Sequence, residues 1–335
     1  MKKNKKSLLE IIDRFQDKRI AVWGDFILDE YIYGTTRRIS REAPVLILSH
    51  QATEFSLGGG GNSLLNLKAL GAKPVPVGII GQDLAGKHIL KILKQKKIAA
   101  DFLIREKAFQ TPIKTRILAG EHSTRKQQIL RIDREARVPE SKALKQSLGS
   151  ALENATDRAA ALLISDYNYR TVQNDVLKKI LPKLKRAKKP VSLDSRFRLL
   201  EFQGLTILTP NEPEVEHALQ VRLDDDSKAA NDAGRELLRK SGAEAVLITR
   251  GVKGMVLFQR GKPAYPIPIY GSEDIVDVTG AGDTVISVLT LALACGASFK
   301  DAAVLANYAG GLVVMKKGTA SVFPGELKEA ILSEH

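Results

Sequence analysis

Short runs of Val, Ile and Leu alternate with amphipathic segments along most of the chain. The apolar runs occupy residues 19–24, 73–80, 160–166, 190–194, 205–210 and 244–251. Runs of this length and composition are typical of strands buried on both faces of a parallel sheet. Apolar positions recur at helical spacing between them, in residues 62–70, 84–97, 141–159, 171–187 and 227–241. The alternation predicts a single open, doubly wound α/β domain over residues 1–335.

Two segments break this alternation. Residues 29–56 and 112–133 have strand composition and turn residues but no helical pattern. Insertions made only of strands do not easily join a buried parallel sheet, so we expect them to form a small separate sheet. We interpret that sheet as a lid inserted in the domain over the functional site. The alternative is a pair of surface hairpins without function.

Composition agrees with a globular protein, because 44% of the residues are hydrophobic and 27% are charged. The longest apolar run, Val285–Ala297, contains Ser287 and Thr290 and is too short to cross a bilayer, so it predicts a buried helix. The N-terminus lacks the apolar core and cleavage site of a secretory signal, so we expect a cytoplasmic protein. The single cysteine, Cys295, lies in the apolar run and is expected to pack there.

The formal net charge is +14. Part of it comes from Lys2, Lys3, Lys5 and Lys6, which we interpret as a solvated tail, and much of the rest lies on predicted helix faces. Such a charge indicates either nucleic-acid binding or a basic surface that attracts anionic metabolites. We favour the second interpretation, because the chain has no nucleic-acid motif and aromatic residues make up only 5% of it.

The stretch "DVTGAGDT" places Gly280, Ala281 and Gly282 directly before Asp283 and an almost uncharged helix. Free backbone N–H groups at such a helix start, together with the helix dipole, form an anion site. We expect the buried helix to hold this end rigidly and Asp283 to stay ionised. A carboxylate beside an anion site suits phosphoryl transfer to a hydroxyl group, because it can accept the hydroxyl proton. The alternative is that Asp283 only caps the helix.

Two further motifs place polar groups where a ligand could bind. The glycine run Gly58–Gly61 allows close approach of the backbone to a ligand, and Asn62 offers a donor and an acceptor to a sugar hydroxyl. Asp25 and Asp29 follow the first strand at the carboxyl edge of the predicted sheet, where open α/β folds bind ligands. The alternatives are a flexible loop with an Asn cap and a pair of turn residues.

Asn211 and Glu214 follow another strand and could reach magnesium or its waters. Their alternative is an ordinary helix start with an Asn cap and early acidic residues. Residues 81–88 match the spacing of a P-loop, but His88 stands where a hydroxyl group is needed to hold magnesium. We therefore do not assign phosphate binding to Lys87.

Taken together, the motifs resemble the ribokinase-type (PfkB) carbohydrate kinases. The likeness rests on "GGGGN" and "DVTGAGDT" in that order, and "NEPE", "TRGVKG" (249–254) and "ANYAGGLVVMKKGTA" (306–320) extend it over about the whole chain. It implies a ribokinase-like fold, with a doubly wound, mostly parallel sheet flanked by helices and a small β-sheet lid. It also implies an enzyme that transfers the γ-phosphoryl group of ATP to a sugar hydroxyl, with Mg²⁺ as cofactor.

The resemblance also implies roles for individual residues. Asp283 would be the catalytic base, and the anion hole would be Gly280, Ala281 and Gly282. The sugar would be held by Asp29, Gly58, Gly59 and Asn62. The nucleotide would be bound by Asn211, Thr249, Gly251, Gly254 and Asn307. Asn211 and Glu214 would organise Mg²⁺, in part through water, and Asp277 and Thr279 match a monovalent-cation site, such as one for K⁺, of some members.

Within the family, "GDFILDEYIYGTTRRISREAPV", "QQILRID" and "LTPNEPEVE" are most similar to the heptose 7-phosphate kinase domains of bifunctional ADP-heptose synthesis proteins. That likeness implies phosphorylation at O1 of D-glycero-D-manno-heptose 7-phosphate, a step toward the lipopolysaccharide core. Arg37, Arg38 and Arg41 are candidates to bind the sugar phosphate, since guanidinium groups bind phosphate bidentately. In relatives the lid can pair between subunits, so we expect a homodimer.

Two segments depart from this subgroup. "SDYNYR" (165–170) has Tyr169 where a lysine is usual, and "LDSRFR" (193–198) replaces Asp-Pro-Lys while it keeps Asp194 and offers Arg196. Asp194 and Arg196 are therefore added to the sugar-binding candidates. Two alternatives stay open: a kinase for an unphosphorylated sugar such as ribose or fructose, and a non-catalytic sugar-binding protein of the same fold.

Overall fold

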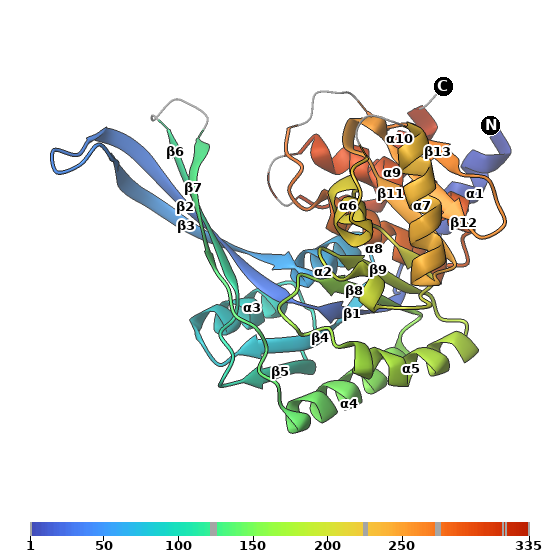
Figure 1. The fold of residues 1–335 in the computed structure, drawn as a ribbon. Coiled ribbons are helices and arrows are strands. Elements are labelled where there is room, and N and C mark those ends of the chain that lie inside the picture. Colours follow the sequence, from blue (N-terminus) through green and yellow to red (C-terminus); the bar gives the residue numbers. More distant parts are fainter. Residues whose placement is uncertain are drawn as a thin grey trace.

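The computed structural model describes residues 2–120, 126–223, 227–271, 276–316, 318 and 320–333. Within them a nine-stranded sheet has the order β13-β12-β11-β10-β9-β8-β1-β4-β5 (Figure 1). The strands from β5 to β11 are parallel, and β12 and β13 join them antiparallel. The bounds are β1 Arg19–Gly24, β4 Lys73–Gly81, β5 Phe102–Glu106, β8 Ala161–Asp166, β9 Val191–Ser195, β10 Ile207–Leu208, β11 Ala245–Thr249, β12 Met255–Gln259 and β13 Tyr265–Ile267.

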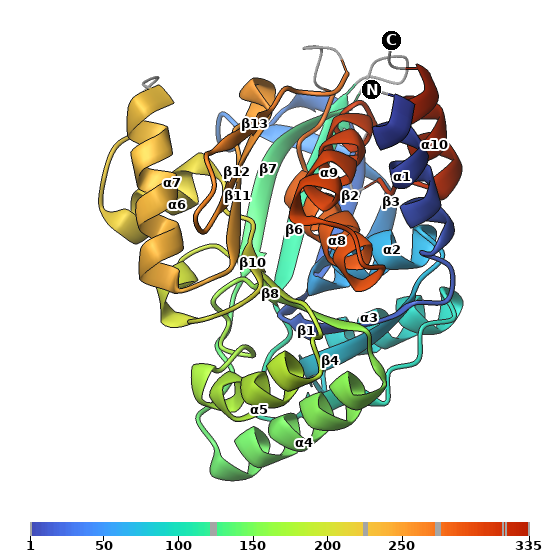
Figure 2. The same ribbon diagram turned by 90° about the vertical axis from the view of Figure 1, so that its right-hand side faces the viewer.

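Helices cover both faces of this sheet, each face with its own apolar core (Figure 2). One face carries α1 Lys2–Asp13, α2 Gly60–Ala69, α3 Leu84–Gln95, α8 Ala281–Ala294, α9 Phe299–Val314 and α10 Pro324–Ser333. The other face carries α4 Lys142–Arg158, α5 Asn174–Arg186, α6 Glu212–Leu219 and α7 Ser227–Ser241. The predicted doubly wound α/β fold is confirmed.

The predicted strands and helices agree with the observed ones to within three residues at each end, except that α8 begins four residues before the predicted helix. Strands β5, β12 and β13 and helices α6, α9 and α10 were not predicted. The prediction of a solvated N-terminal tail is wrong, because its lysines belong to helix α1. Leu8, Ile11 and Ile12 of this helix are buried in the core, and this apolar stripe outweighs the lysines before it. Cys295 is buried just after α8, as predicted. No helix in the described ranges is long and apolar enough to span a bilayer.

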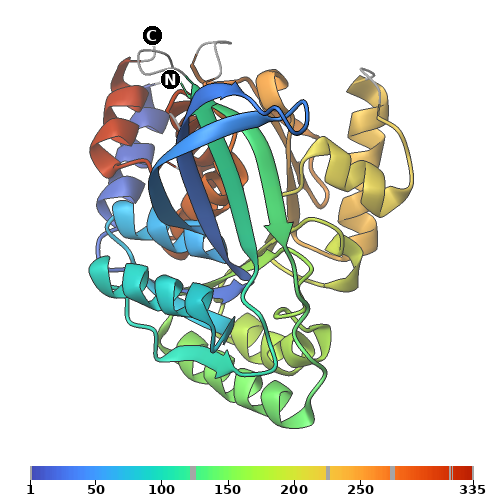
Figure 3. The ribbon, with the colours of Figure 1, turned by 90° about the vertical axis from the view of Figure 1, so that its left-hand side faces the viewer.

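A separate four-stranded sheet has the order β3-β2-β6-β7. Its strands are β2 Phe26–Ile39, β3 Leu46–Gly59, β6 Ile113–Gly120 and β7 Gln127–Arg134. The two hairpins join through parallel pairing of β2 with β6. Figure 1 shows this sheet projecting from the body of the molecule, and Figure 3 shows it in front of α8 and α9. The two strand-rich segments therefore pair with each other, as the sequence predicts.

Glycines allow β3 to pass directly into α2. Gly59 is the N-cap residue of α2 and has a φ of 57°, which favours glycine. The glycine run is therefore the end of a strand and the start of a helix, without an intervening loop. Helix α2 in turn bonds to α8, since Thr284 Oγ1 donates to Asn66 Oδ1 at 3.0 Å and Ser287 Oγ donates to the Ser63 carbonyl at 3.3 Å. The starts of α2 and α8 are thus fixed side by side.

Candidate active site

Helix α8 begins at Ala281, and Gly280 precedes it with a φ of 79° and no side-chain cap. Asp283 lies inside the first turn and is 4% exposed. It is therefore not the N-cap residue, which excludes the capping alternative. The residues from Asp283 to Leu293 are all buried, as the apolar sequence predicts. The first turn leaves backbone N–H groups without intrahelical acceptors, so the start of α8 can bind an anion.

Three hydrogen-bond donors surround the Asp283 carboxylate. Asn62 Nδ2 donates to it at 2.9 Å, the Tyr167 hydroxyl at 3.3 Å, and the Ser63 hydroxyl lies 3.5 Å away. Burial raises the pKa of Asp283 to about 6, although the bonds from Asn62 and Tyr167 lower it. The sequence argument considered only the helix dipole, whereas burial is the larger influence. The group is still mostly ionised at neutral pH and can accept a proton.

Asn62 lies in the first turn of α2 and is not the N-cap residue, which is Gly59. Its side chain is buried and faces Asp283, 221 positions away in the sequence. Asn66 Nδ2 donates to the Asn62 carbonyl at 3.0 Å and lies 3.4 Å from Asn62 Oδ1, which fixes the amide. The two glycine-rich motifs therefore converge on one carboxylate.

A small cavity of about 70 Å³, here called the polar cavity, opens in front of Asp283. Asp29 and Arg116 form an ion pair at its wall, with 2.6 Å between Oδ1 and Nη1. A Cβ atom on Gly58 would lie 2.6 Å from Asp29 Oδ2, so glycine is required for this approach. The lining residues are Ile27, Asp29, Gly58, Gly59, Asn62, Lys114, Arg116, Tyr167, Arg196, Thr279, Gly280 and Asp283.

Two cations of the polar cavity lie close to the ring of Tyr167. Lys114 Nζ is 5.1 Å and Arg196 Cζ is 4.8 Å from the centre of its ring, which is the geometry of cation–π contacts. Burial raises the pKa of the Tyr167 hydroxyl well above its usual range, so the phenol is a hydrogen-bond donor to Asp283. Burial and the nearby Arg196 lower the pKa of Lys114.

Asp25 has a structural role in holding the loop that carries Tyr167. Its carboxylate accepts hydrogen bonds from the backbone N–H groups of Tyr167 at 2.8 Å, Tyr169 at 3.1 Å and Thr171 at 3.2 Å. The Tyr169 hydroxyl donates to Glu135 at 3.0 Å. Asp29 therefore lines the polar cavity, whereas Asp25 influences the site only by holding the loop that carries Tyr167.

A second cavity of about 170 Å³, here called the apolar cavity, lies on the other side of the turn before α8. Ala281 and Gly282 line it, whereas Gly280 and Asp283 line the polar cavity. Asn307 also lines it, and its Nδ2 donates to the Pro268 carbonyl at 2.8 Å. The other lining residues are Thr249, Gly251, Gly254, Met255, Ile269, Val278, Val285, Gly310, Gly311 and Val314. The start of α8 thus separates a charged cavity from an apolar one.

Asn211 and Glu214 form a capping box at the start of α6. Asn211 Oδ1 accepts from the Glu214 N–H at 2.9 Å, and Glu214 Oε2 accepts from the Asn211 N–H at 3.0 Å. The helix-start interpretation is therefore right, and it leaves the second oxygen of Glu214 for other partners. Burial raises the pKa of Glu214. Burial, together with the carboxylates of Glu214 and Asp283, raises the pKa of Asp194 well above its usual range.

Asp277 and Thr279 form a turn before α8. Asp277 accepts the backbone N–H of Thr279 at 2.9 Å and that of Gly318 at 3.0 Å. Burial opposes these bonds, but they prevail and lower the pKa of Asp277. In the described ranges no group of three or more His, Cys, Asp or Glu side chains is arranged to hold a metal ion.

The P-loop-like segment is not part of either cavity. Asp83 caps α3 by accepting from the Gly86 N–H at 2.7 Å, so a carboxylate already occupies the start of that helix. Lys87 is exposed. Arg41 is exposed in the turn between β2 and β3, while the side chains of Arg37 and Arg38 lie outside the described residues.

Sequence reasoning missed Lys114, Arg116 and Tyr167. Lys114 and Arg116 are two residues apart on β6 and both line the polar cavity. Two cations at this spacing on an otherwise apolar strand were the available signal, because alternate residues share a face. Tyr167 directly follows β8, at the carboxyl edge of the sheet where ligands bind in open α/β folds.

The profile of the family described as "pfkB family carbohydrate kinase" matches residues 17–325. The chain belongs to this family. The "Bifunctional protein HldE" of Paramagnetospirillum magneticum is 35% identical over 98% of this chain and 66% of its own length. The Caulobacter vibrioides protein of the same name is 39% identical over 93% of this chain and 63% of its own length. The chain spans about two thirds of the length of the curated relatives it matches.

Solved structures of other carbohydrate kinases show the same fold. Arabidopsis thaliana ribokinase, complexed with ribose and ATP, is 20% identical with a TM-score of 0.69, over 94% of this chain and 99% of its own. Escherichia coli phosphofructokinase-2 in complex with fructose-6-phosphate is 17% identical with a TM-score of 0.73, over 95% of this chain and 99% of its own. The pfkB carbohydrate kinase therefore has a ribokinase-like fold, as predicted.

Proposed function

We propose that this carbohydrate kinase transfers the γ-phosphoryl group of ATP to O1 of D-glycero-D-manno-heptose 7-phosphate. The observation that carries the proposal is the buried carboxylate of Asp283, in the first turn of α8 between the polar and the apolar cavity. The HldE names of relatives at 35–39% identity support the heptose phosphate as acceptor.

The reaction joins one oxygen to phosphorus and releases another. The sugar hydroxyl in the polar cavity attacks the γ-phosphorus, the bond from that phosphorus to the ADP oxygen breaks, and the hydroxyl proton passes to Asp283. The backbone N–H groups of Gly280, Ala281 and Gly282 and the positive end of the α8 dipole stabilise the negative charge on the phosphoryl oxygens. Asp29 and Asn62 orient the sugar through its hydroxyl groups.

The nucleotide base binds in the apolar cavity, with Thr249, Gly251, Gly254 and Asn307 around it. The Arabidopsis ribokinase of the same fold is described with ATP bound, which supports ATP as the nucleotide. The apolar lining suits a base, and Ala281 and Gly282 bring the same cavity to the anion site. This cavity and the polar cavity meet at the turn, so a nucleotide here directs its phosphates to the sugar.

Mg²⁺ fits the carboxylates beside this site. Burial and the neighbouring Glu214 carboxylate raise the pKa of Asp194, and a divalent cation relieves repulsion between half-buried carboxylates. Mg²⁺ in kinases keeps several waters and uses one or two carboxylates plus substrate phosphates, so the absence of a three-residue cluster among the described residues is compatible with it. Bound there through Asn211 and Glu214, the ion would neutralise phosphate charge. For K⁺ we propose the turn of Asp277 and Thr279, as a potassium complex of phosphofructokinase-2 suggests.

Three cations near the polar cavity suit a phosphorylated sugar better than a neutral one. Arg116 is paired with Asp29, but Arg196 forms no ion pair with any described residue. Lys114 is buried at the same wall, and its lowered pKa reflects the cost of an unneutralised cation there. A phosphate on the acceptor would satisfy Arg196 and Lys114 together. Arg196 thereby takes the place of the lysine usual in the subgroup.

A sugar panel tests the function. ADP release is measured with heptose 7-phosphate, heptose, fructose 6-phosphate, fructose and ribose. We expect the highest kcat/KM for heptose 7-phosphate, and a loss of at least tenfold for each sugar without its phosphate. Faster turnover of free ribose or fructose would replace the proposed acceptor and leave the kinase chemistry in place.

We also propose that the four-stranded sheet acts as a lid and as the contact between two copies of the chain in the cytoplasm. Apolar side chains are exposed on it, namely Leu46, Ile129, Leu130 and Ile132, and Val45 is exposed just before β3. Exposed apolar residues gathered on one sheet favour an interface.

A further inference from the structure

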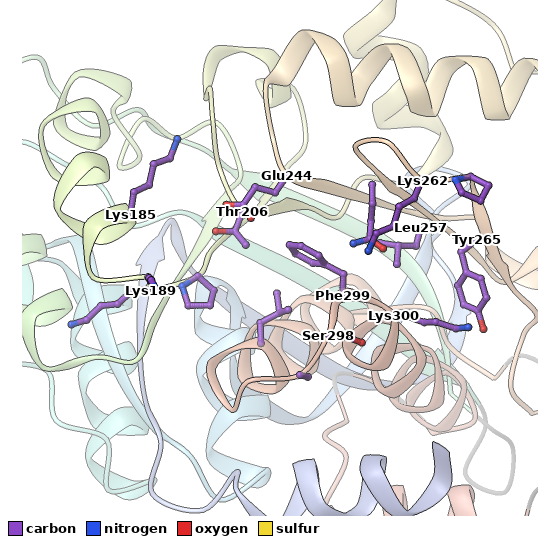
Figure 4. A pocket seen from close by; sticks show the side chains of 16 residues that line it. Lys185, Lys189, Thr206, Glu244, Leu257, Lys262, Tyr265, Ser298, Phe299 and Lys300 are labelled. Carbon is purple, nitrogen blue, oxygen red and sulfur yellow. The ribbon is translucent and has the colours of Figure 1, made fainter. Parts of the chain in front are cut away.

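A cavity of about 950 Å³, far larger than the polar and apolar cavities, opens elsewhere on the molecule (Figure 4). We call it the lysine cavity. Its lining residues are Lys185, Lys188, Lys189, Pro190, Thr206, Glu244, Leu257, Gln259, Lys262, Pro263, Tyr265, Leu293, Ala297, Ser298, Phe299 and Lys300. None of them lines the active site.

The lysine cavity lies at the edge of the sheet opposite to the active site. Pro190, Thr206 and Glu244 each stand just before one of the parallel strands β9, β10 and β11. The active-site candidates Asp194 and Thr249 lie at the carboxyl ends of β9 and β11. The lysine cavity is thus a separate site, one strand length away, at the amino ends of the strands.

The charge of the lysine cavity is uncompensated. Five lysines line it, against one carboxylate, Glu244. Lys185, Lys188 and Lys262 form no ion pair with any residue the structure describes. Lys300 Nζ lies 4.1 Å from the ring centre of Tyr265, and Lys189 donates to two backbone carbonyl groups. Like charges around one cavity repel each other, and a bound anion would remove that repulsion.

A second lysine-lined cavity, between α4 and α5, shows the contrast. It holds Lys142, Lys145, Lys179 and Lys183. Lys145 pairs with Asp175 at 2.7 Å, and Lys183 pairs with Glu153 at 3.0 Å and Asp157 at 2.7 Å. Three carboxylates thus offset most of the charge of its four lysines, so this cavity provides a matched control.

The middle of the lysine cavity is apolar. Leu257 and Leu293, which line it, are buried, and the half-buried side chain of Phe299 packs against the same apolar core. Figure 4 shows Phe299 and Leu257 between Lys185 and Lys189 on one side and Lys262 and Lys300 on the other. The volume is within the range of small-molecule clefts, about 300–1,000 Å³. The cavity therefore offers an aromatic surface for stacking and ammonium groups on both sides of it.

We propose that the lysine cavity is a second ligand site, for a small organic anion with at least two negative charges and an aromatic body. A nucleoside diphosphate has this chemistry: the base stacks on Phe299 and the diphosphate meets the lysines. The site is independent of the catalytic one, and binding there does not require Asp283 or the turn before α8.

Calorimetric titration with ADP at low salt counts the sites directly. We compare the natural chain with K185E/K262E and with the control K142E/K179E, which changes the net charge by the same amount at the balanced cavity. We expect K185E/K262E to bind one ADP fewer per chain than the other two proteins. Its remaining site should keep its affinity within about twofold. Thermal unfolding of all three checks that they are folded.

Adenosine and tripolyphosphate separate the two parts of the ligand. Each should bind the lysine cavity at least tenfold more weakly than ADP, because one lacks the charge and the other the ring. An equal number of bound ADP molecules in the three proteins would overturn the proposal. So would equal losses in the two charge-reversed variants, since that result would reflect only long-range attraction. Tripolyphosphate binding as tight as ADP binding would refute the aromatic requirement.

Discussion

Asp283 is both the proposed base and a source of instability. Its pKa is about 6 in the folded protein against an ordinary value of 3.8, so the folded state holds the proton more tightly. Stability contributed by the protonated form is therefore lost as the pH rises from about 4 through about 6. At neutral pH the ionised, buried group costs about 3 kcal/mol, since each pKa unit corresponds to about 1.4 kcal/mol.

The substitution Asp283→Asn should separate stability from activity. We expect the variant to be more stable than the natural chain at pH 7.5, by up to about 3 kcal/mol, and to differ little at pH 4. Its kcat should fall by about 10²–10⁴-fold, the usual contribution of a general base. Urea unfolding at the two pH values measures the two stability differences, and ADP release at pH 7.5 measures the fall in kcat. Near-normal turnover would show that the base is another group.

Tyr167 should lower the pKa of the proposed base, Asp283. Its hydroxyl donates to the Asp283 carboxylate and lowers the pKa of that group, so Tyr167→Phe should move the acidic limb of kcat/KM to higher pH. The control is Tyr169→Phe, because the Tyr169 hydroxyl bonds to Glu135 and leaves Asp283 untouched. The measurement is kcat/KM from pH 5 to 8. Identical acidic limbs in the two variants would mean that Tyr167 has no influence on the base.

Single residues were predictable where residue type and position in a motif coincide. Asp283, Asn62 and Asp29 are polar groups at a helix start or strand end, and all three line the polar cavity. The bond of Tyr167 to Asp283 could not be predicted, because it joins residues 116 positions apart, although the position of Tyr167 directly after β8 was a signal for a site residue. The raised pKa of Asp283 could not be predicted from the sequence either, since the burial that causes it depends on the packing of α2, α8 and the four-stranded sheet.

At the level of the elements, the close approach of β3 to Asp29 of β2 depends on Gly58. A Cβ atom there would lie 2.6 Å from Asp29 Oδ2, and Arg116 holds that carboxylate in place. Gly58→Ala should displace Asp29 and raise KM for the sugar by at least tenfold, with a smaller effect on KM for ATP. The comparison of the two KM values is the measurement.

Gly149→Ala is the control for this prediction. The added Cβ would be 4.0 Å from Val176, an ordinary contact, and alanine stabilises a helix interior by about 1 kcal/mol over glycine. This variant, in α4, should be slightly more stable and keep both KM values. An unchanged KM for the sugar in Gly58→Ala would remove Asp29 from the binding site.

Six of the nine strands in the large sheet were predictable because strands buried on both faces leave continuous apolar runs. Strands β5, β12 and β13 were not predicted. The sequence predicts that the two strand-rich segments form one sheet, but not that β2 and β6 are the strands that pair, nor that they pair in parallel. These two strands are far apart in the chain, and parallel pairing has no turn to reveal it. Helix α1 was missed for another reason. Its apolar stripe of Leu8, Ile11 and Ile12 is short, and the lysines before it resemble a tail.

At the scale of the whole molecule, the four-stranded sheet should join two chains. Exposed Leu46, Leu130 and Ile132 would be buried between them, and the sheet would keep its place over α8. Sedimentation at micromolar concentration should give a dimer, and Leu130→Glu/Ile132→Glu should give a monomer, because two charges would enter an apolar contact. A single monomeric species for the natural chain would contradict this assembly.

The most direct test of the proposed mechanism is a crystal structure with a non-hydrolysable ATP analogue and heptose 7-phosphate. We expect an Asp283 carboxylate oxygen within about 2.6–3.2 Å of the acceptor hydroxyl. The terminal phosphate should rest on the backbone N–H groups of Gly280, Ala281 and Gly282. A sugar whose hydroxyl groups all lie away from Asp283, or a terminal phosphate bound elsewhere, would contradict the account.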